Sequence, residues 1–325
     1  MIVKPRVKIT RGLLFRSYKG DVRAMNSNQS FKIGIISGLG SYLLWGVFPI
    51  YWKLLEHIDP LVVLAHRVIW SLCFVLIIIL VSNQFKKAIL EGKSIFKNVK
   101  RFIGIISASI LISINWYVFI WAVSNEYVLQ ASLGYYINPL INVILAFFFF
   151  KERFNRKQII AFLLAFIGVM FITIDYGEFP YVSILLALTF GLYGLLKKMV
   201  NVSSLVGLFV ETLLISPLAF LFLFQSNLTP HLAITDQTTW LLIGGGIATA
   251  IPLLLFASAA KRIPFSLIGF LQYLAPTIML ILGVFIYKEP FSWIQAIAFL
   301  FIWSGLIFFT LASSKRSIER KVTAT

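Results

Sequence analysis

Charged residues are scarce in this sequence, and most of those present carry the same sign. They make up 13% of the 325 positions, whereas ordinary soluble domains contain about 25%. Hydrophobic residues make up 59% of the chain, and the mean hydropathy is +0.91. A soluble protein of this length needs far more polar surface to cover its core, so we expect an integral membrane protein.

Residues that build catalytic and metal sites are scarce too. Cys73 is the single cysteine, and one cysteine supports neither a disulfide framework nor a metal cluster. Of three histidines, only His66 falls within an apolar run, and no P-loop, G-x-S-x-G or H-E-x-x-H motif occurs. We therefore expect no metal, no cofactor and no catalytic residue. The missing P-loop also argues against ATP-driven transport by this chain alone.

Long apolar runs are what the sequence has in abundance. A spanning helix needs about 20 mostly apolar residues, and ten runs meet that length. The predicted spans are residues 33–55, 60–82, 102–124, 128–150, 158–175, 180–199, 204–224, 238–260, 264–287 and 292–312. These runs predict an all-α integral membrane protein of ten transmembrane helices.

The net charge of +17 lies between these runs and at the chain ends. Ten spans bring both termini to one side of the membrane. If that side is cytoplasmic, its segments hold 26 of the 29 Lys and Arg, including Lys197 and Lys198, and an external segment holds only Lys288. This is the positive-inside pattern. We therefore expect cytoplasmic termini and a lipid bilayer as the partner, with no nucleic acid.

Two basic tails flank the predicted spans, at residues 1–30 and 315–325. Residues 1–24 hold seven Lys or Arg and one acid, and no small-residue cleavage site follows them. The first apolar run is long enough to span, so it is not the core of a signal peptide. We expect residues 1–24 to be a poorly ordered tail, or to be absent from a native protein that starts at Met25.

One segment of the sequence is repeated 137 positions later without a gap. Pro139 then meets Pro276, and Glu152 meets Glu289; further matched pairs are Tyr136 and Tyr273, Lys151 and Lys288, Gln158 and Gln295, Ala161 and Ala298, and Gly168 and Gly305. Predicted helices four and five thus recur as helices nine and ten. Each repeat has five helices, an odd number, so the second enters the membrane inverted. We expect two units, residues 31–175 and 176–314, in the ground plan common among secondary transporters.

Several short motifs carry a family resemblance. Residues 66–71 read HRVIWS, and residues 131–140 read ASLGYYINPL. Other motifs are Trp45-Gly46, Asn115-Trp116, Glu152-Arg153-Phe154, Glu211-Thr212, Gln272-Tyr273 and Pro276-Thr277. Through them, over about residues 31–312, the chain resembles the RarD branch (chloramphenicol-sensitive protein) of the EamA-type drug/metabolite transporters. The resemblance implies two EamA repeats in the bacterial cytoplasmic membrane and export of a small molecule, but no particular substrate.

Ionisable groups within a membrane cost several kcal/mol unless paired or wet, and four fall within predicted helices: Lys53, His66, Arg67 and Glu211. Arg67 lies about 10 Å from the outer end of helix two, and Glu211 at a similar depth from the inner end of helix seven. We expect them to flank a central cavity without a direct salt bridge. Arg67 is predicted to attract a substrate carboxylate, and Glu211 to bind a substrate amine or a coupling proton. The alternatives are snorkelling of Arg67 and a hydrogen-bonded structural role for Glu211.

Pro139 and Pro276 each remove one backbone N–H, so we expect helix kinks there. A carbonyl freed in lipid must face protein or a wet cavity. The predicted substrate-binding wall comprises Asn115, Trp116, Tyr135, Tyr136, Asn138, Gln272, Tyr273 and Thr277, together with Arg67. The alternatives are kinks that serve packing only, and interhelical hydrogen bonds from helix three. Lys53 is expected to snorkel, and His66 to be structural.

Taken together, these features predict a secondary active transporter of a small-molecule substrate that works by alternating access. Proton coupling through Glu211 is an additional hypothesis. A passive channel, a facilitator or a lipid scramblase is the alternative, and a membrane-embedded enzyme is disfavoured because clustered catalytic residues are missing. A monomer and a homodimer both remain open, since the two halves already supply pseudo-symmetry.

Overall fold

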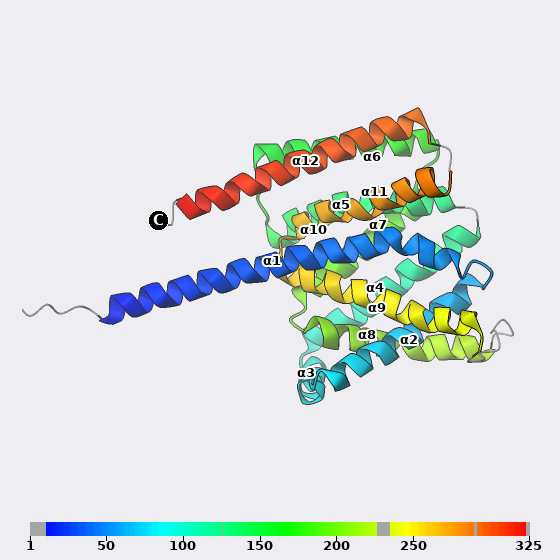
Figure 1. Cartoon of the computed structure of the whole chain (residues 1–325), viewed down its shortest axis with the longest axis horizontal. Helices are drawn as coiled ribbons and strands as arrows, with labels where there is room; N and C mark the ends of the chain where they lie inside the picture. Colours follow the sequence, from blue (N-terminus) through cyan, green and yellow to red (C-terminus); the bar gives the residue numbers. More distant parts are fainter. Residues whose placement is uncertain (1–10, 126, 226–234, 289–290, 323–325) are drawn as a thin grey trace, which may run out of the picture.

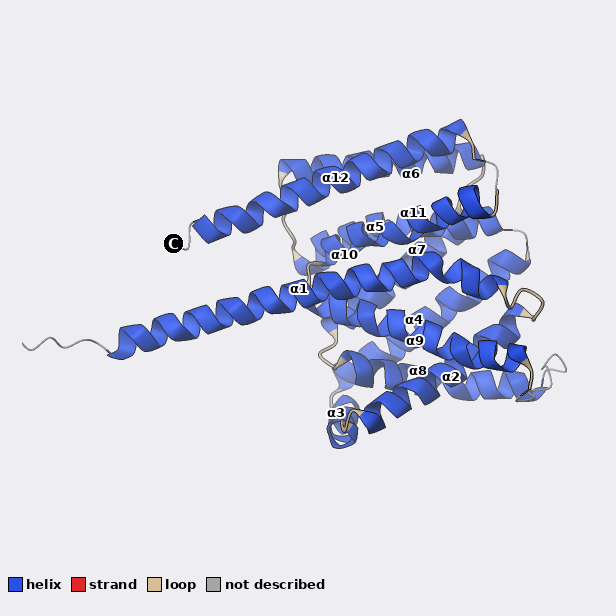
Figure 2. Ribbon diagram, viewed as in Figure 1, coloured by secondary structure: helices blue, strands red, loops and turns tan. Residues whose placement is uncertain are grey.

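The structure is a computed structural model that describes residues 11–125, 127–225, 235–288 and 291–322. Over these residues it is helical without strands (Figure 1, Figure 2). Ten of its helical segments are long and apolar enough to cross a membrane. The predicted all-α fold with ten spanning segments is therefore confirmed.

The spanning helices pack as one bundle, with the ninth span broken into pieces. In chain order they are α1 (Arg11–Lys53), α2 (Pro60–Val81), α4 (Val99–Ser124), α5 (Val128–Phe150), α6 (Arg156–Tyr176), α7 (Tyr181–Met199), α8 (Ser204–Gln225), α9 (Gln237–Arg262), α10 (Phe265–Gln272), α11 (Leu274–Ile281), the π-helical turn η1 (Leu282–Ile286) and α12 (Trp293–Val322). The apolar part of each span lies within about five residues of its predicted limits. Apolar run length alone was therefore enough to locate them.

Two segments outside the predicted spans are helical. Residues 83–101, between the second and third predicted spans, contain α3 (Phe85–Lys97). A left-handed turn at Asn83 (φ 58°) separates α3 from α2. The tail at residues 1–24, which we expected to be poorly ordered, forms the start of α1 from Arg11 onward. Residues 1–10 of that tail lie outside the described residues.

One end of the bundle gathers basic residues. The start of α1 and the end of α12 project from this end, and α3 lies across it (Figure 1). Here α7 and α9 finish and α10 begins, which places Lys197, Lys198, Lys261 and Arg262 at this end. We call it the basic end, and the other the opposite end. Both chain ends thus leave the bundle on one side, as an even number of spans requires.

Helices α6 and α12 lie side by side through a self-complementary contact (Figure 1). A Cβ atom on Gly168 would lie 2.6 Å from the carbonyl oxygen of Ala298, and one on Gly305 would lie 2.7 Å from that of Ala161. An offset of 137 positions exchanges these two contacts. The contact between the two helices is therefore of the kind that two copies related by a two-fold axis form.

The loops that precede α6 and α12 also match at this offset. Lys151 and Lys288 both have left-handed backbone, with φ of 51° and 58°. Before α6, Asn155 and Gln158 form reciprocal capping hydrogen bonds, and before α12, Ser292 and Gln295 form the same pair. The correspondence seen in sequence therefore extends to backbone conformation and hydrogen bonding.

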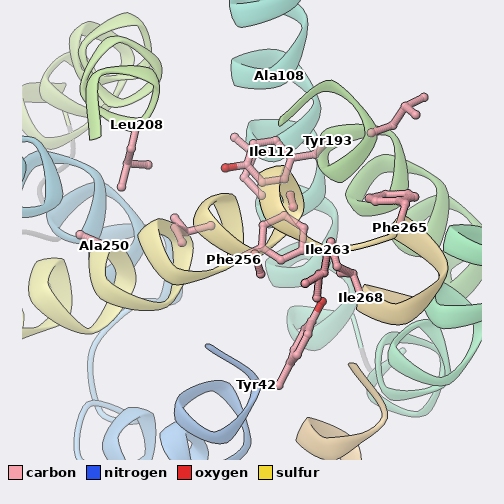
Figure 3. Packing of buried hydrophobic residues seen from close by; sticks show 14 of the residues in the cluster. Tyr42, Ala108, Ile112, Tyr193, Leu208, Ala250, Phe256, Ile263, Phe265 and Ile268 are labelled. Atoms are coloured by element: carbon pink, nitrogen blue, oxygen red, sulfur yellow. The ribbon is translucent and has the colours of Figure 1, made fainter. Parts of the chain in front are cut away.

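The largest apolar core fills the half of the bundle nearest the basic end (Figure 3). Its buried aromatic side chains come from α1, α7, α9 and α10: they are Tyr42, Tyr193, Phe256 and Phe265. The rings of Tyr193 and Phe256 stack with centroids 6.1 Å apart. Aromatic pairs of this kind add about 0.5–1.5 kcal/mol to simple burial. Dense aromatic packing therefore closes this half of the bundle.

The α6–α12 contact predicts equal costs for two substitutions. Gly168→Ala and Gly305→Ala should each lower the free energy of unfolding by about 1–3 kcal/mol, because the new methyl group meets backbone that cannot rotate away. Thermal unfolding in detergent micelles measures this. Gly92→Ala on α3 is the control, since a Cβ there meets nothing within 4 Å. A large effect at only one of the two core glycines would contradict the symmetric contact.

Candidate functional site

Arg67 is a cation within the bundle whose contacts are a hydroxyl group and two indole rings. Its Nε donates a hydrogen bond of 2.9 Å to Thr249 Oγ1 on α9. Its Cζ lies 4.5 Å from the ring centroid of Trp52 and 5.6 Å from that of Trp116. Among the described residues no carboxylate lies within ion-pairing distance of it. The two indole rings stabilise the guanidinium by cation–π attraction, and the side chain is only half-buried.

We call Arg67, Trp52, Trp116 and Thr249 the Arg67 cluster. Its members come from α2, α1, α4 and α9, and all lie toward the opposite end of the bundle. Close packing of α2 on α9 brings them together, because a Cβ on Gly246 would lie 2.4 Å from the backbone of Trp70. Arg67 therefore reaches across to α9 instead of snorkelling to the membrane surface.

Two predicted wall residues on neighbouring helices lie in different settings. Tyr135 is 36% exposed, and its ring makes an edge contact with Phe119, with centroids 6.0 Å apart. It also lies within electrostatic range of Arg67. Asn115 donates both amide hydrogens to α7, at 2.9 Å to the Leu186 carbonyl and 2.9 Å to Thr189 Oγ1. Asn115 therefore fastens α4 to α7, as the interhelical alternative predicts.

A buried chain of amides links α5 to α7 and α10. Asn138 donates to the Ala187 carbonyl at 2.7 Å. Asn142 donates to Asn138 Oδ1 at 3.1 Å and to Gln272 Oε1 at 2.9 Å. The Asn142 Oδ1 atom is buried without a partner among the described atoms. The predicted pair Asn138 and Gln272 is thus joined, but through Asn142 and inside the helix packing.

Three other predicted wall residues contact α12 instead of joining the Arg67 cluster. Tyr136 packs edge-on against Phe299, with ring centroids 5.4 Å apart. Thr277 accepts a hydrogen bond of 3.1 Å from Trp303 Nε1. Tyr273 lies fully buried in the same small core as Tyr136. Sequence reasoning placed them on the correct helices but could not tell which face of the helix they occupy.

The two prolines behave differently. The ninth span breaks between α10 and α11 at Tyr273, three residues before Pro276. Pro276 cannot donate to the Gln272 carbonyl, so the ladder of hydrogen bonds is interrupted there. By contrast, α5 continues as one helix through Pro139. The broken span then ends in the π-helical turn η1.

Glu211 has a partner that the sequence analysis missed. Its Oε1 accepts a hydrogen bond of 2.7 Å from the ammonium of Lys197, and its Oε2 accepts one of 3.2 Å from the Tyr193 hydroxyl. Lys197 and Glu211 are both almost fully buried. Lys197 was counted with a cytoplasmic segment and left out of the intramembrane charges, but its side chain is buried within the bundle against Glu211. The one signal in the sequence for this contact was the i, i+4 spacing of Tyr193 and Lys197, which places both side chains on the same face of a helix.

The Lys197–Glu211 pair borders a cavity of about 10 Å³, which has room for about one water molecule. The ammonium of Lys261 also lines this cavity. The lack of a side chain at Gly207 helps to make this space, since a Cβ atom there would lie 3.5 Å from Lys197 Nζ. This charged cavity lies near the basic end, and the Arg67 cluster lies toward the opposite end. The expected separation of Arg67 from Glu211 therefore holds.

Hydrogen bonds tie helix ends together at the basic end. Glu152, after α5, accepts hydrogen bonds from the backbone N–H of Phe265 at 2.7 Å and from Ser266. Lys198 donates to the carbonyls of Ala260 and Ile263 at the end of α9. These contacts join α5 to α10 and α7 to α9. Together with the aromatic core of Figure 3 they hold this end shut.

The two remaining ionisable residues of the predicted spans are Lys53 and His66. Lys53 is exposed at the end of α1, with its ammonium 4.3 Å from the ring centroid of Tyr287. This agrees with a snorkelling side chain. His66 is buried, and its Nε2 has no partner among the described atoms. Neither residue joins the Arg67 cluster.

The buried ion pair predicts a strong asymmetry between single and double substitutions. Lys197→Met should lower the free energy of unfolding by about 3–5 kcal/mol, because it leaves a buried carboxylate without its countercharge. Adding Glu211→Met should restore most of that loss, since apolar replacements remove both charges. Thermal unfolding of the purified protein measures both. Lys198→Met is the control, because Lys198 donates hydrogen bonds to carbonyls and lies over the Phe150 ring without a salt bridge among the described residues; an equal loss there would contradict the ion-pair explanation.

Comparison with known proteins indicates the family to which the chain belongs. The EamA-like transporter family matches the chain twice, at residues 32–174 and 181–311. The chain is 48% identical to "Uncharacterized transporter YojE" of Bacillus subtilis over 288 residues, which cover 87% of this chain and 95% of that protein. It is 36% identical to "Protein RarD" of Escherichia coli over 290 residues, with 88% and 96% covered.

More distant similarities agree with these. "Chloramphenicol-sensitive protein RarD" of Pseudomonas aeruginosa is 27% identical over 275 residues, with 84% of this chain and 92% of that protein covered. A solved crystal structure has the same fold with a TM-score of 0.68 at 19% identity, covering 86% of this chain and 98% of its own. The chain therefore belongs to the RarD branch of the EamA-like transporter family and is a multi-pass membrane transporter.

Proposed function

We propose that the protein is a secondary transporter that exports a small organic solute by recognising an anionic group on it at Arg67. The observation that carries this proposal is the guanidinium of the Arg67 cluster, which has no carboxylate partner among the described residues. A charge kept inside a membrane without a countercharge is costly, so its retention favours a binding role. A carboxylate can take both remaining nitrogens in bidentate fashion.

The surroundings of Arg67 narrow the class of solute. Trp52 and Trp116 present flat apolar surfaces beside the guanidinium, and Tyr135 and Phe119 lie on the adjoining helices. These rings favour a solute with an anionic group on an apolar or aromatic body. Metabolites such as amino acids with aromatic side chains, and drugs of similar shape, belong to this class. The name of the Pseudomonas relative links that protein to chloramphenicol sensitivity, and amphenicols, which carry no anionic group, therefore enter the test panel as neutral compounds for comparison.

The two ends of the bundle support alternating access. The basic end is closed by aromatic packing and by the contacts of Glu152 and Lys198. Arg67 is half-buried and lies toward the opposite end. With the basic end assigned to the cytoplasm by the positive-inside rule, the structure corresponds to a state closed toward the cytoplasm. Export then requires the basic end to open so that solute reaches Arg67 from inside.

The moving parts of the proposal are two inverted units, residues 31–175 and 176–314. Their support is the internal match of 137 positions, together with the paired contacts of Gly168 and Gly305 and the matched loops at Lys151 and Lys288. Rocking of one unit against the other exposes a central site to each side in turn. The bacterial cytoplasmic membrane, with both termini inside, is the location that this topology proposes.

Proton coupling through Glu211 is the second part of the proposal. Glu211 and Lys197 form a pair near the basic end, beside a cavity that holds about one water molecule. A proton taken up by Glu211 cancels its charge and releases Lys197. Because this pair bridges α7 and α8, its release loosens the closed end of the bundle. Proton uptake and opening toward the cytoplasm are thereby linked.

One surface feature bears on the alternative of a lipid scramblase. An apolar groove of about 200 Å³ lies between the α5–α10 side and the α6–α12 pair. Gln158 is its single polar side chain, and the other lining residues are Val143, Ile144, Phe147, Phe148, Phe154, Ile159, Phe162, Phe270 and Phe309. A scramblase needs a continuous polar path for the headgroup, which this lining does not offer. The groove therefore favours the transporter over the scramblase.

Substitution of Arg67 tests solute recognition. Arg67→Gln should lower radiolabelled solute counterflow in proteoliposomes at least tenfold, because it removes the charge that binds the anion. Arg67→Lys should retain a fraction of the flux, since an ammonium keeps the charge but loses the planar bidentate contact. Lys53→Gln, which removes an exposed charge nearby, is the control. Normal counterflow by Arg67→Gln of the aromatic amino acids that the wild type exchanges would exclude this site.

Substitution of Glu211 tests the coupling separately. Wild-type proteoliposomes containing a pH-sensitive dye should show a saturable signal when a transported solute is added. Glu211→Gln should lose that signal while it retains counterflow, because exchange of solute for solute requires no net proton movement. A normal dye signal in Glu211→Gln would remove the proton role. Flux that neither saturates nor shows counterflow in the wild type would indicate a passive channel.

A further inference from the structure

Helix α3 is an element that transport by the bundle does not explain. It joins α2 to α4 at the basic end and is too short to span a membrane. In Figure 1 it is seen almost end-on, while the spanning helices run across the picture. Its axis therefore crosses the bundle direction and lies along the plane of the membrane surface.

One side of α3 is fixed to the bundle. Ile95 is completely buried in a small core with Ile105 and Val206. Glu91 accepts hydrogen bonds from the backbone N–H of Ser203 and, at 2.6 Å, from its hydroxyl, so it caps the start of α8. Glu91 is the single acidic residue of α3. Its use in capping leaves the outer sides of the helix with positive charge only.

The outer sides of α3 carry an apolar stripe and a lysine stripe, and the exposed Leu90 borders the lysine stripe on its far side. At about 100° per residue, Phe85, Ile89 and Phe96 fall within about 40° of one another, and they are 49%, 42% and 66% exposed. The second stripe consists of the exposed residues Lys86, Lys93 and Lys97, which also fall within about 40° of one another. The two stripes lie about 80° apart. This arrangement is typical of helices that lie in the membrane interface, with apolar side chains among acyl chains and lysines among headgroups.

We propose that α3 is a binding site for anionic phospholipids of the cytoplasmic leaflet, with phosphatidylglycerol as the type of ligand. The lysine stripe supplies the charge complementary to the phosphate group, and the apolar stripe supplies contact with the acyl chains. Zwitterionic lipids lack the net charge that the lysines select. Bound lipid is held next to α8 because Glu91 and Ile95 fix α3 to that helix.

The size of the effect follows from the lysine stripe. One lysine near an anionic membrane surface changes affinity about fivefold. Replacement of three should therefore weaken binding on the order of a hundredfold. The effect should fall steeply as salt concentration rises, because the lysines are exposed and screened. Folding should be unaffected, since none of the three lysines donates a hydrogen bond to another described residue.

The test uses the full chain purified in detergent and titrated with phosphatidylglycerol or phosphatidylcholine of matched acyl chains, with bound lipid counted by native mass spectrometry. The wild type should bind phosphatidylglycerol more tightly. The variant K86Q/K93Q/K97Q should lose this preference on the order of a hundredfold. The matched control is K32Q/R156Q/K157Q, which removes three exposed cations elsewhere and should retain it.

Three outcomes would overturn the proposal. Equal binding of the two lipids by the wild type would show that α3 does not select charge. An equal loss in the control variant would show a general surface-charge effect and no site on α3. Displacement of the lipid by glycerophosphoglycerol, the headgroup without acyl chains, at equal concentration would show that the apolar stripe takes no part. Unchanged thermal unfolding of both variants without lipid confirms that they are folded.

Discussion

A charge inside a bilayer costs several kcal/mol unless it is paired or hydrated, and the arrangement of this protein follows from how few charges it keeps there. For Glu211 this cost is offset by a buried salt bridge to Lys197 and a hydrogen bond from the Tyr193 hydroxyl. Arg67 meets it differently, with Thr249 and two indole rings. The first arrangement is saturated with partners. The second leaves two guanidinium nitrogens without a hydrogen-bond partner among the described residues, which is the basis of the proposed recognition of an anion.

Close helix packing puts these charges where they are. In lipid, helices gain nothing from burying apolar surface against each other, so small residues at crossing points decide which helices meet. Gly246 lets α2 approach α9 and so brings Arg67 to Thr249. Gly168 and Gly305 let α6 and α12 meet through two matched contacts. The same kind of residue therefore serves both the site and the internal symmetry.

The two ends of the bundle differ in how extensively their helices are joined to one another. At the basic end, aromatic packing, the Glu152 and Lys198 contacts and the capping of α8 by Glu91 join most of the helices into one block. Toward the opposite end, polar and aromatic side chains such as Arg67 and Tyr135 remain partly exposed. A transporter needs one closed and one open end at a time. The broken ninth span offers a place where the closed end can yield.

The ten spans, the basic character of one end and the internal match could be predicted from the amino-acid sequence, because each depends on composition and spacing along the chain. Arg67 and Glu211 could be singled out in the same way, since an ionisable residue in an apolar run is conspicuous without coordinates. The sequence could not predict that Lys197 turns inward to Glu211 while its neighbour Lys198 caps α9. Only the structure assigned Tyr136 and Thr277 to α12 and Asn115 to α7. Neighbouring residues on a helix point about 100° apart, and which direction meets a partner depends on helices distant in sequence.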